Sequence, residues 1–273
     1  MDIETLVTLA LQEDVGPGDV TTEACVSAGQ DGQARVVARQ RLVVSGQVPA
    51  TAVFARLGVR YEPALADGEL AQAGALMGRA SGPVRGILTG ERLALNFLGW
   101  LSGIASHTRR HVEAAGGAFE VVDTRKTTPL HRGLEKAAVR HGGGKNHRFA
   151  LYDGVLIKDN HIVAAGSIEA AVQESRARAH HLLRVQVEVE SLAQAREAIK
   201  AGADALLLDN LDDDTLAVVV PALTGRVLLE VSGGMDVARI ERLRQRGILP
   251  DQVSIGGLIH QARWADVALE LEG

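Results

Sequence analysis

The feature that most constrains the fold is a repeated alternation that begins after residue 115. Short aliphatic runs are followed by polar loops and, between the later runs, by helical segments. Strands that alternate with helices predict a parallel sheet joined by right-handed crossovers. We therefore expect an α/β fold with a β/α barrel of fewer than eight repeats, and a doubly wound open sheet is the alternative. The expected strands are Phe119–Val122, Val155–Ile157, Val185–Val189, Ala205–Leu208, Val227–Val231 and Val253–Ile255.

Helix-end signals support two of the crossover helices. Ser191 opens a segment of the capping-box form, with a glutamine three residues later, and Gly202 can end that helix. Asp236 can cap a helix over Val237–Arg246, and Gly247 can close it. Both signals lie between expected strands, as a β/α repeat requires.

The first part of the chain, residues 1–114, has a different order of expected helices and strands. An opening helix over Asp2–Glu13 precedes strand-like pieces such as Ala34–Val44, and a long helix is expected from about Gly90 to Ala115. Apolar residues recur in the long helix at helical spacing and predict a buried face; they are Leu93, Phe97, Trp100 and Ile104. Small residues on it would let another element approach closely: Gly99, Ser102, Gly103 and Ser106.

Composition excludes several classes of protein. Hydrophobic residues make up 46% and aromatics only 3%, so the core must be aliphatic. No apolar run is long enough to cross a bilayer, and the first residues are acidic where a signal peptide would be basic. Cys25 is the one cysteine, which excludes an internal disulfide. We expect a soluble, cytoplasmic protein.

The charge is distributed unevenly along the chain. The net charge of −5 argues against nucleic acid as the main partner. Between Asp123 and His161, however, eight Lys or Arg and four His face only four carboxylates. A basic pocket in an acidic protein indicates a small, polyanionic ligand.

Polar and glycine residues follow each expected strand. In β/α barrels, the catalytic groups lie at the carboxyl ends of the strands. The strand-end groups are Asp123–Thr128, Lys158–His161, Glu188 with Glu190, Asp209–Asn210, Ser232–Gly234 and Gly256–Gly257.

These residue types suit different parts of one ligand set. Arginine and lysine bind carboxylates and phosphates. Ser232–Gly234, directly before a helix, can present backbone N–H groups to an anion. Glu188 and Asp209 on neighbouring strands suit Mg²⁺, which takes one or two protein carboxylates and completes its shell with phosphates and water. The sequence therefore predicts a pocket for carboxylates, a phosphate and a magnesium-bound polyphosphate.

Some of these residues also have simpler interpretations. Arg125 and Lys126, taken alone, could form a solvated turn. Arg132, Lys136 and Arg140 recur at helical spacing and favour an exposed helix face, which leaves Arg132 as a weak ligand candidate. His161 could cap a helix as easily as bind a ligand.

Longer motifs carry a family resemblance over nearly the whole chain. They include Glu13-Asp14-x-Gly16-x-Gly18-Asp19-x-Thr21-Thr22, Glu91-Arg92-x-Ala94-Leu95-Asn96-Phe97, Leu101-Ser102-Gly103-Ile104-Ala105, Asp123-Thr124-Arg125-Lys126-Thr127-Thr128-Pro129, Leu134-Glu135-Lys136-x-Ala138-Val139-Arg140, Gly142-Gly143-Gly144-x-Asn146-His147-Arg148 and Leu156-Ile157-Lys158-Asp159-Asn160-His161. In these segments the chain resembles the quinolinate phosphoribosyltransferase family, which joins quinolinate to the ribose of phosphoribosyl pyrophosphate and releases carbon dioxide.

The resemblance implies an architecture. An N-terminal α/β sandwich domain, residues 1–114, would pack on an open, seven-stranded β/α barrel, residues 115–259, which carries the active site. A C-terminal helix, about 260–273, would pack back on the first domain. The resemblance also implies a homodimer with shared active sites.

The resemblance further implies roles for the candidate residues. The quinolinate carboxylates would be bound by Arg125, His147, Arg148 and Lys158, with Arg92 entering from the partner subunit. Lys126 would lie between the two substrates, and Glu188 and Asp209 would face the ribose and pyrophosphate with Mg²⁺. Ser232, Gly233, Gly234 and Gly256 would bind the 5′-phosphate. Lys126, Glu188 and Asp209 are the expected catalytic residues.

Three positions depart from the family pattern, and two alternatives remain. Leu130 stands where a glycine usually follows Thr-Thr-Pro, Gln186 replaces a commonly acidic residue, and Ile259 replaces a hydroxyl residue. One alternative is a related transferase associated with molybdenum transport that acts on another acceptor. The other is a non-catalytic phosphate-ligand sensor, which would be expected to lack Glu188 or Asp209.

Overall fold

The computed structural model describes residues 2–272, which form two compact units. The first unit contains the chain up to Arg109, the segment Thr127–Gly143 and the chain from Gln261 onward, and the second contains Arg110–Lys126 and Gly144–His260. The assignment of 127–143 to the first unit differs from the expected boundary near residue 115. The reason is packing, because Leu134 lies against the apolar core of the first unit.

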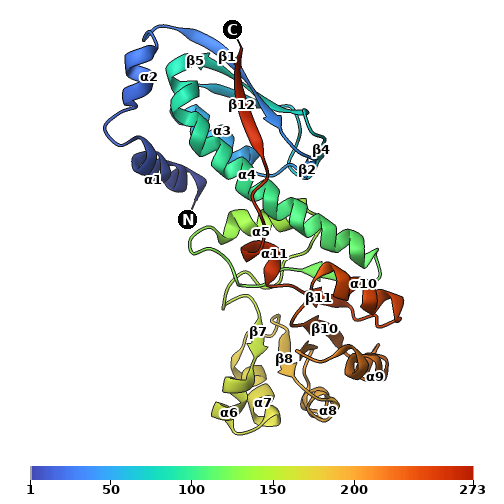
Figure 1. Ribbon diagram of the computed structural model, residues 1–273. Coiled ribbons are helices and arrows are strands. Elements are labelled where there is room, and N and C mark those ends of the chain that lie inside the picture. The colour runs from blue at the N-terminus through green and yellow to red at the C-terminus, as the bar shows by residue number, and fades with distance from the viewer. Residues whose placement is uncertain (1, 273) are drawn as a thin grey trace. The chain divides into compact units, whose positions relative to one another are not determined.

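The first unit is built on a four-stranded antiparallel sheet of order β12-β1-β5-β3, with a two-stranded ribbon of β2 and β4 (Figure 1). Its elements are α1 (Ile3–Val15), α2 (Val20–Cys25), β1 (Asp31–Ala38), β2 (Leu42–Val43), α3 (Gln47–Arg56), β3 (Arg60–Pro63), β4 (Leu70–Ala71), β5 (Leu76–Pro83), α4 (Val84–Ala115, crossing into the second unit at Arg110), α5 (Arg132–His141) and β12 (Val267–Glu272).

The core of the first unit joins the sheet to α3 and α4. Val36 of β1, Phe54 of α3 and Leu98 of α4 are fully or almost fully buried in one cluster. Phe54 stacks on Tyr61 with ring centroids 5.2 Å apart, and the Tyr61 hydroxyl donates to Gln47 Oε1 at 2.9 Å. The unit is therefore an α/β sandwich whose core is mainly aliphatic.

The C-terminal segment forms a strand, and the expected helix over about 260–273 is wrong. Strand β12 pairs with β1 in antiparallel register from Val267 to Glu272, at the edge of the sheet in Figure 1. The stretch Val-Ala-Leu-Glu-Leu-Glu alternates with a period of two residues, and its partner strand lies more than 200 residues earlier in the chain. The alternation is typical of a strand, but no residue near it in the sequence indicates which strand it pairs with.

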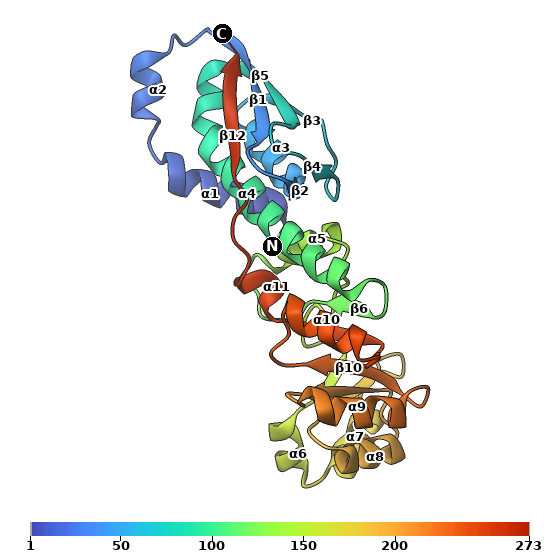
Figure 2. The same cartoon turned by 45° about the vertical axis from the view of Figure 1, so that its right-hand side comes forward.

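The second unit is a parallel sheet of order β6-β11-β10-β9-β8-β7. Figure 2 labels the helices α6 to α10 that alternate with its later strands. Its elements are β6 (Glu120–Val122), β7 (Val155–Ile157), α6 (Asp159–Ala165), α7 (Ile168–Arg178), β8 (Val185–Val189), α8 (Leu192–Ala201), β9 (Ala205–Asp209), α9 (Asp213–Leu223), β10 (Leu228–Ser232), α10 (Val237–Gln245), β11 (Gln252–Ser254) and α11 (Gly257–His260).

All six strands expected from the aliphatic runs are present, within a residue or two of their expected ends. The expected caps are present too: Ser191 accepts from the N–H of Gln194 at 3.2 Å, and Asp236 accepts from the N–H of Arg239 at 2.7 Å. Within residues 2–272 the sheet has one strand fewer than the seven of the resemblance, and an isolated parallel bridge joins Val122 to Lys145 at its β6 edge. Within the same residues, no helix combines the length and apolar character that a membrane crossing requires.

Candidate active site

The parallel register brings the expected carboxylates and the glycine turn to one edge and one face of the sheet. Glu188 on β8 lies opposite Leu207 on β9, and Asp209 on β9 lies opposite Ser232 on β10. Because alternate residues of a strand point to the same face, Glu188, Asp209 and Ser232 share a face. The sheet itself therefore assembles these three residues.

Two arginines form the basic part of this edge. Arg125 follows β6, and Arg148 follows the turn after Lys145. Burial and the positive charge of Arg125 lower the pKa of the Arg148 guanidinium, while Asp153 acts in the opposite direction. Arg148 Nη1 donates to the carbonyl of Gly154 at 2.7 Å, which fixes its direction. Two neighbouring cations favour an anion that can be shared between them.

Buried Asp123 holds the loop that carries the basic residues. Its carboxylate accepts from Asn146 Nδ2 at 2.6 Å and from the His147 N–H at 2.8 Å, and its own N–H donates to the carbonyl of Lys145 at 3.1 Å. The side chain is fully buried. Asp123 thus ties residues 145–147 to the end of β6, so that the loop has a defined geometry although it is rich in glycine.

His147 is held from both sides of its ring. Nδ1 accepts from the N–H of Arg148 at 2.8 Å, and Nε2 lies 3.1 Å from Gln186 Oε1 and 3.3 Å from Glu230 Oε2. These contacts direct both ring nitrogens toward protein groups. Nε2 thus faces Gln186 and the Glu230 carboxylate, and Nδ1 links the ring to the backbone of Arg148.

Glu230, on β10, is the centre of a buried polar network. Gln186 Nε2 donates to Glu230 Oε2 at 2.8 Å and Gln252 Nε2 at 3.2 Å, and the Glu230 side chain is fully buried. Burial raises the pKa of Glu230, but hydrogen bonds and charge from His147, helped by Ser254 and Gln186, hold it below its ordinary value. Gln186 departs from the family pattern, in which this residue is commonly acidic. Its side-chain amide therefore donates to the buried Glu230 carboxylate, where the family pattern would place a second carboxylate.

Lys158 and Glu188 form an ion pair at the neighbouring strand ends. Glu188 is mostly buried, with 15% of its side chain exposed, while 45% of the Lys158 side chain is exposed. His161 Nδ1 accepts from the Lys158 N–H at 3.0 Å, so His161 serves the start of α6, as the simpler interpretation held. The resemblance gave Lys158 and Glu188 to different substrates, and in the structure their side chains pair with each other.

The glycine turn after β10 lies against the end of β9. The Asn210 N–H donates to the carbonyl of Ser232 at 3.1 Å, and Asn210 Nδ2 donates to Asp209 Oδ2 at 2.6 Å. Gly233 has φ +94°, and a Cβ there would lie 2.1 Å from Asn210 Oδ1. Only glycine fits this close approach.

Lys126 lies over the turn after β11. A Cβ on Gly256 would lie 2.7 Å from Lys126 Cδ and 3.3 Å from its Nζ. The glycine therefore makes room for the lysine side chain. The ammonium group consequently lies beside the last strand end of the site.

Of the residues to which the resemblance gives a role, Arg92 alone belongs to the first unit, where it is exposed on α4. Arg132 also lies in the first unit, and its Nε donates to Thr127 Oγ1 at 2.9 Å. The expectation of an exposed helix face is wrong at Lys136, whose side chain is buried. The neighbouring Glu135 is buried too, and it accepts from the Thr128 N–H at 2.8 Å and from its hydroxyl at 2.7 Å.

Sequence reasoning missed Glu230 and assigned no role to Asp123. A signal for Glu230 did exist, because polar residues alternate inside otherwise apolar strands at Gln186 and Glu188, at Glu230 and Ser232, and at Gln252 and Ser254. Such alternation in a sheet expected to be covered on both faces indicates a polar interior on one face.

Two family models match almost the whole chain. The model of the quinolinate phosphoribosyl transferase N-terminal domain matches residues 19–102, and that of the C-terminal domain matches residues 104–270. A probable nicotinate-nucleotide pyrophosphorylase (carboxylating) of Bacillus subtilis strain 168 is 36% identical over 274 residues, covering 99% of this chain and 94% of the relative. The nicotinate-nucleotide pyrophosphorylase (carboxylating) of Homo sapiens is 38% identical over 275 residues, covering 98% and 91%.

Solved structures share the fold over almost the whole chain. The crystal structure of NadC from Streptococcus pyogenes superimposes with a TM-score of 0.94 at 41% identity, covering 99% of this chain and 96% of that one. The nicotinate-nucleotide pyrophosphorylase of Francisella tularensis gives 0.94 at 34% identity with the same coverage. The chain therefore belongs to the quinolinate phosphoribosyltransferase family.

Proposed function

We propose that this chain transfers the phosphoribosyl group of phosphoribosyl pyrophosphate to the ring nitrogen of quinolinate, with loss of carbon dioxide, in NAD biosynthesis. The observation that carries the proposal is the composition of one sheet edge. The Arg125–Arg148 cation pair, the carboxylates Glu188 and Asp209, and the glycine turn after β10 are all placed there by the second unit. A dicarboxylate, a ribose and a phosphate are the groups that these three parts would bind.

The basic side of the site would bind quinolinate. Arg125, Arg148 and Lys158 would pair with the two carboxylates, and His147 would hold Arg148 in place. The lowered pKa of Arg148 fits this role, because burial and the neighbouring cation together disfavour its charge until an anion balances it. Lys126, beside Gly256, would reach between the dicarboxylate and the pyrophosphate.

The acidic side would bind the ribose and a magnesium ion. Glu188 and Asp209 share a face on adjacent strands, and Mg²⁺ typically takes one or two carboxylates and completes its shell with substrate phosphates. The donor set therefore fits magnesium held jointly by the protein and the pyrophosphate. Such an ion would supply positive charge near the leaving group.

The chemistry needs few covalent roles from the protein. The quinolinate nitrogen donates its pair to C1 of the ribose while the bond from C1 to the pyrophosphate oxygen breaks and its electrons leave with pyrophosphate. The ring nitrogen is then cationic, so the bond to the 2-carboxylate can break with its electrons left on C2, which takes up a proton. Glu188 and Asp209 would offset positive charge on the ribose, and the arginines would aim the nitrogen at C1.

The decisive test is a choice between two acceptors. With phosphoribosyl pyrophosphate and magnesium, quinolinate should give nicotinate mononucleotide, pyrophosphate and carbon dioxide, as identified by mass. Nicotinate should be a poor acceptor, because a site built for two carboxylates loses one of its ion pairs when a carboxylate is missing. Comparable turnover of nicotinate, or turnover of another acceptor alone, would contradict the assignment.

The proposal extends to assembly and location. We place the enzyme in the cytoplasm, and we propose a homodimer in which Arg92 of each subunit enters the partner's site. The family resemblance supports the dimer. The location of Arg92 in the first unit, apart from the other site residues in the second, makes it a suitable group for such a contribution.

A further inference from the structure

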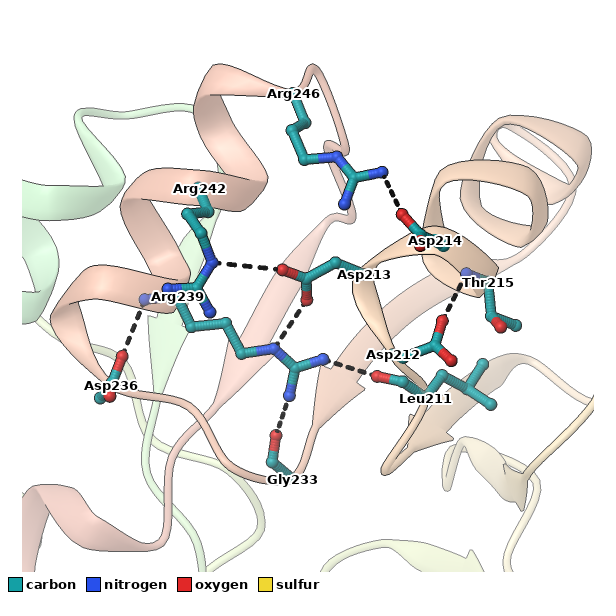
Figure 3. Close-up of polar contacts among 10 residues, drawn as sticks. All are labelled: Leu211, Asp212, Asp213, Asp214, Thr215, Gly233, Asp236, Arg239, Arg242 and Arg246. Atoms are coloured by element: carbon teal, nitrogen blue, oxygen red, sulfur yellow. Dashed lines mark hydrogen bonds and ion pairs between the residues drawn. The ribbon is translucent and has the colours of Figure 1, made fainter.

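Arg239, in the first turn of α10, makes contacts that the proposed mechanism does not use. Its Nε donates to Asp213 Oδ1 at 2.9 Å, its Nη1 to the carbonyl of Gly233 at 2.6 Å and its Nη2 to the carbonyl of Leu211 at 2.5 Å (Figure 3). Only 13% of the Arg239 side chain and 17% of Asp213 are exposed. One guanidinium thus reaches three acceptors in a largely buried setting, which is the geometry that its planar fork suits best.

Two of these acceptors belong to loops at the proposed active site. Gly233 is in the turn proposed to bind the 5′-phosphate, and Leu211 is two residues after Asp209. In Figure 3 the Arg239 side chain extends from α10 to both loops. The two loops also contact each other through Asn210 and Ser232.

The contact with Gly233 fixes the direction of the next N–H group. No cis peptide bond occurs within residues 2–272, so the carbonyl of Gly233 and the N–H of Gly234 point in opposite directions. When Arg239 holds the carbonyl, the Gly234 N–H must point away from the guanidinium. The orientation of this phosphate donor is therefore set by a side chain that does not itself need to touch the ligand.

The loops need such an external constraint. Asn210, Gly233 and Gly234 all have positive φ, at +54°, +94° and +57°. Positive φ is sparsely populated for Asn210, while the two glycines adopt positive and negative φ about equally, so these residues do not hold the loops in one conformation by themselves. Arg239 supplies that constraint on both loops at once, and Asp213 balances its charge.

We propose that Arg239 is a positioning residue for the 5′-phosphate of phosphoribosyl pyrophosphate, acting through the Gly233–Gly234 peptide. The inference rests on the proposed function, because it assumes that this turn binds the 5′-phosphate. It concerns this substrate alone. Quinolinate would bind to the basic residues after β6 and β7, which Arg239 does not contact.

The test compares Arg239→Lys with Arg246→Lys. Lysine keeps the charge at 239 but cannot reach three acceptors in one plane. Arg246 is the matched control, because it joins the same two helices through Asp214 at 2.7 Å, with 42% and 91% of the two side chains exposed, and contacts no loop carbonyl in Figure 3. Arg239→Lys should raise KM for phosphoribosyl pyrophosphate by about tenfold while KM for quinolinate stays within about twofold. Arg246→Lys should leave both values unchanged.

Two inhibitors probe the two ends of phosphoribosyl pyrophosphate separately. Ribose 5-phosphate, which carries the 5′-phosphate alone, should inhibit Arg239→Lys more weakly than the parent, whereas inhibition by inorganic pyrophosphate should be unchanged. If Arg239→Lys folds poorly, the milder Asp213→Asn variant can be used in its place. Its inhibition by ribose 5-phosphate should also be weaker than that of the parent. Equal loss of both inhibitors, or unchanged ribose 5-phosphate inhibition in both variants, would overturn the proposal.

The two proposals can fail separately. If the parent enzyme transfers no phosphoribosyl group, the proposed function fails. The role of Arg239 can then be tested by calorimetric titration with ribose 5-phosphate, which replaces the kinetic measurement. A parent that binds ribose 5-phosphate and an Arg239→Lys variant that binds it about tenfold more weakly would still support the positioning role. If the parent does not bind it either, the role of Arg239 fails as well.

Discussion

Leu130 adopts a backbone conformation that leucine rarely occupies. Its φ is +69°, and 74% of its surface is exposed, so the side chain gains little packing. The left-handed conformation costs a non-glycine residue about 1–2 kcal/mol. Glycine removes that strain. Its greater conformational freedom in the unfolded chain, however, lowers the free energy of unfolding by about 0.5–1 kcal/mol. The departure from the glycine of the family pattern is therefore a local cost in stability.

We expect Leu130→Gly to raise the free energy of unfolding by about 0.5–1 kcal/mol. Urea unfolding would show it as a higher midpoint with an unchanged slope. Leu130→Ala is the control, because it removes the exposed side chain but keeps the Cβ that causes the strain. If alanine stabilises as much as glycine, the backbone conformation is not the reason.

Glu230 gives the stability of the protein a specific pH dependence. Its pKa in the folded chain lies below the ordinary 4.5, so the ionised form is favoured by folding. That contribution is complete above the unfolded pKa and is lost as the pH falls through the folded pKa. At neutral pH, Glu230→Gln should therefore lower the free energy of unfolding by about 1–3 kcal/mol.

The difference between parent and Glu230→Gln should shrink as the pH is lowered below about 4.5. Unfolding in urea at a series of pH values measures it. Glu174→Gln is the control, since Glu174 pairs with Arg178 on an exposed helix face and should change stability by less than about 0.5 kcal/mol. A gap that stays constant with pH would show that Glu230 does not act through its charge.

Replacing two helical glycines by alanine should change the stability of the protein in opposite directions. Gly103 on α4 lies under the chain before β12, where a Cβ would be 2.2 Å from the carbonyl oxygen of Arg263. Gly133 on α5 has no atom within 4 Å of its Cβ position. Gly103→Ala should destabilise by about 1–3 kcal/mol through overpacking, and Gly133→Ala should stabilise by up to about 1 kcal/mol through helix propensity. Thermal unfolding of both variants would decide, and a shift in the same direction for both would contradict this account.

Local patterns were enough to predict most of the second unit. Each β/α repeat carries its strand, cap and helix within about 30 residues, so the six strands and the helix starts at Ser191 and Asp236 follow from the sequence. The parallel order then brings the strand ends together without further information. What failed was non-local, because the pairing of β12 with β1 and the burial of Lys136 depend on segments far apart in the chain.

The same distinction applies within the site. Glu188, Asp209 and Ser232 could be placed on one edge from the strand pattern alone. The contacts of His147 with Glu230, and of Arg239 with two loop carbonyls, depend on the rotamers of side chains from different repeats. Spacing along the chain carries no information about such contacts.

The small residues of α4 pack against other parts of the same chain. The small residues of α4 suggested close packing against another element, and the chain itself supplies that element. Gly99 and Gly103 lie against residues 263–265, and the Ser102 hydroxyl bonds to the backbone of Ser45. These residues therefore give no support for a dimer, and the proposal rests on Arg92 and the family resemblance.

Mixing two inactive variants tests the trans role of Arg92. Arg92→Ala and Arg125→Ala chains should each be nearly inactive alone, because each lacks a cation proposed to bind quinolinate. If Arg92 acts across a two-fold interface, every mixed dimer contains one site with both arginines intact. Random mixing makes about half of the dimers mixed, so about a quarter of parent activity should return. If Arg92 serves its own barrel, both sites of a mixed dimer are defective, and a mixture shown to contain mixed dimers would stay inactive.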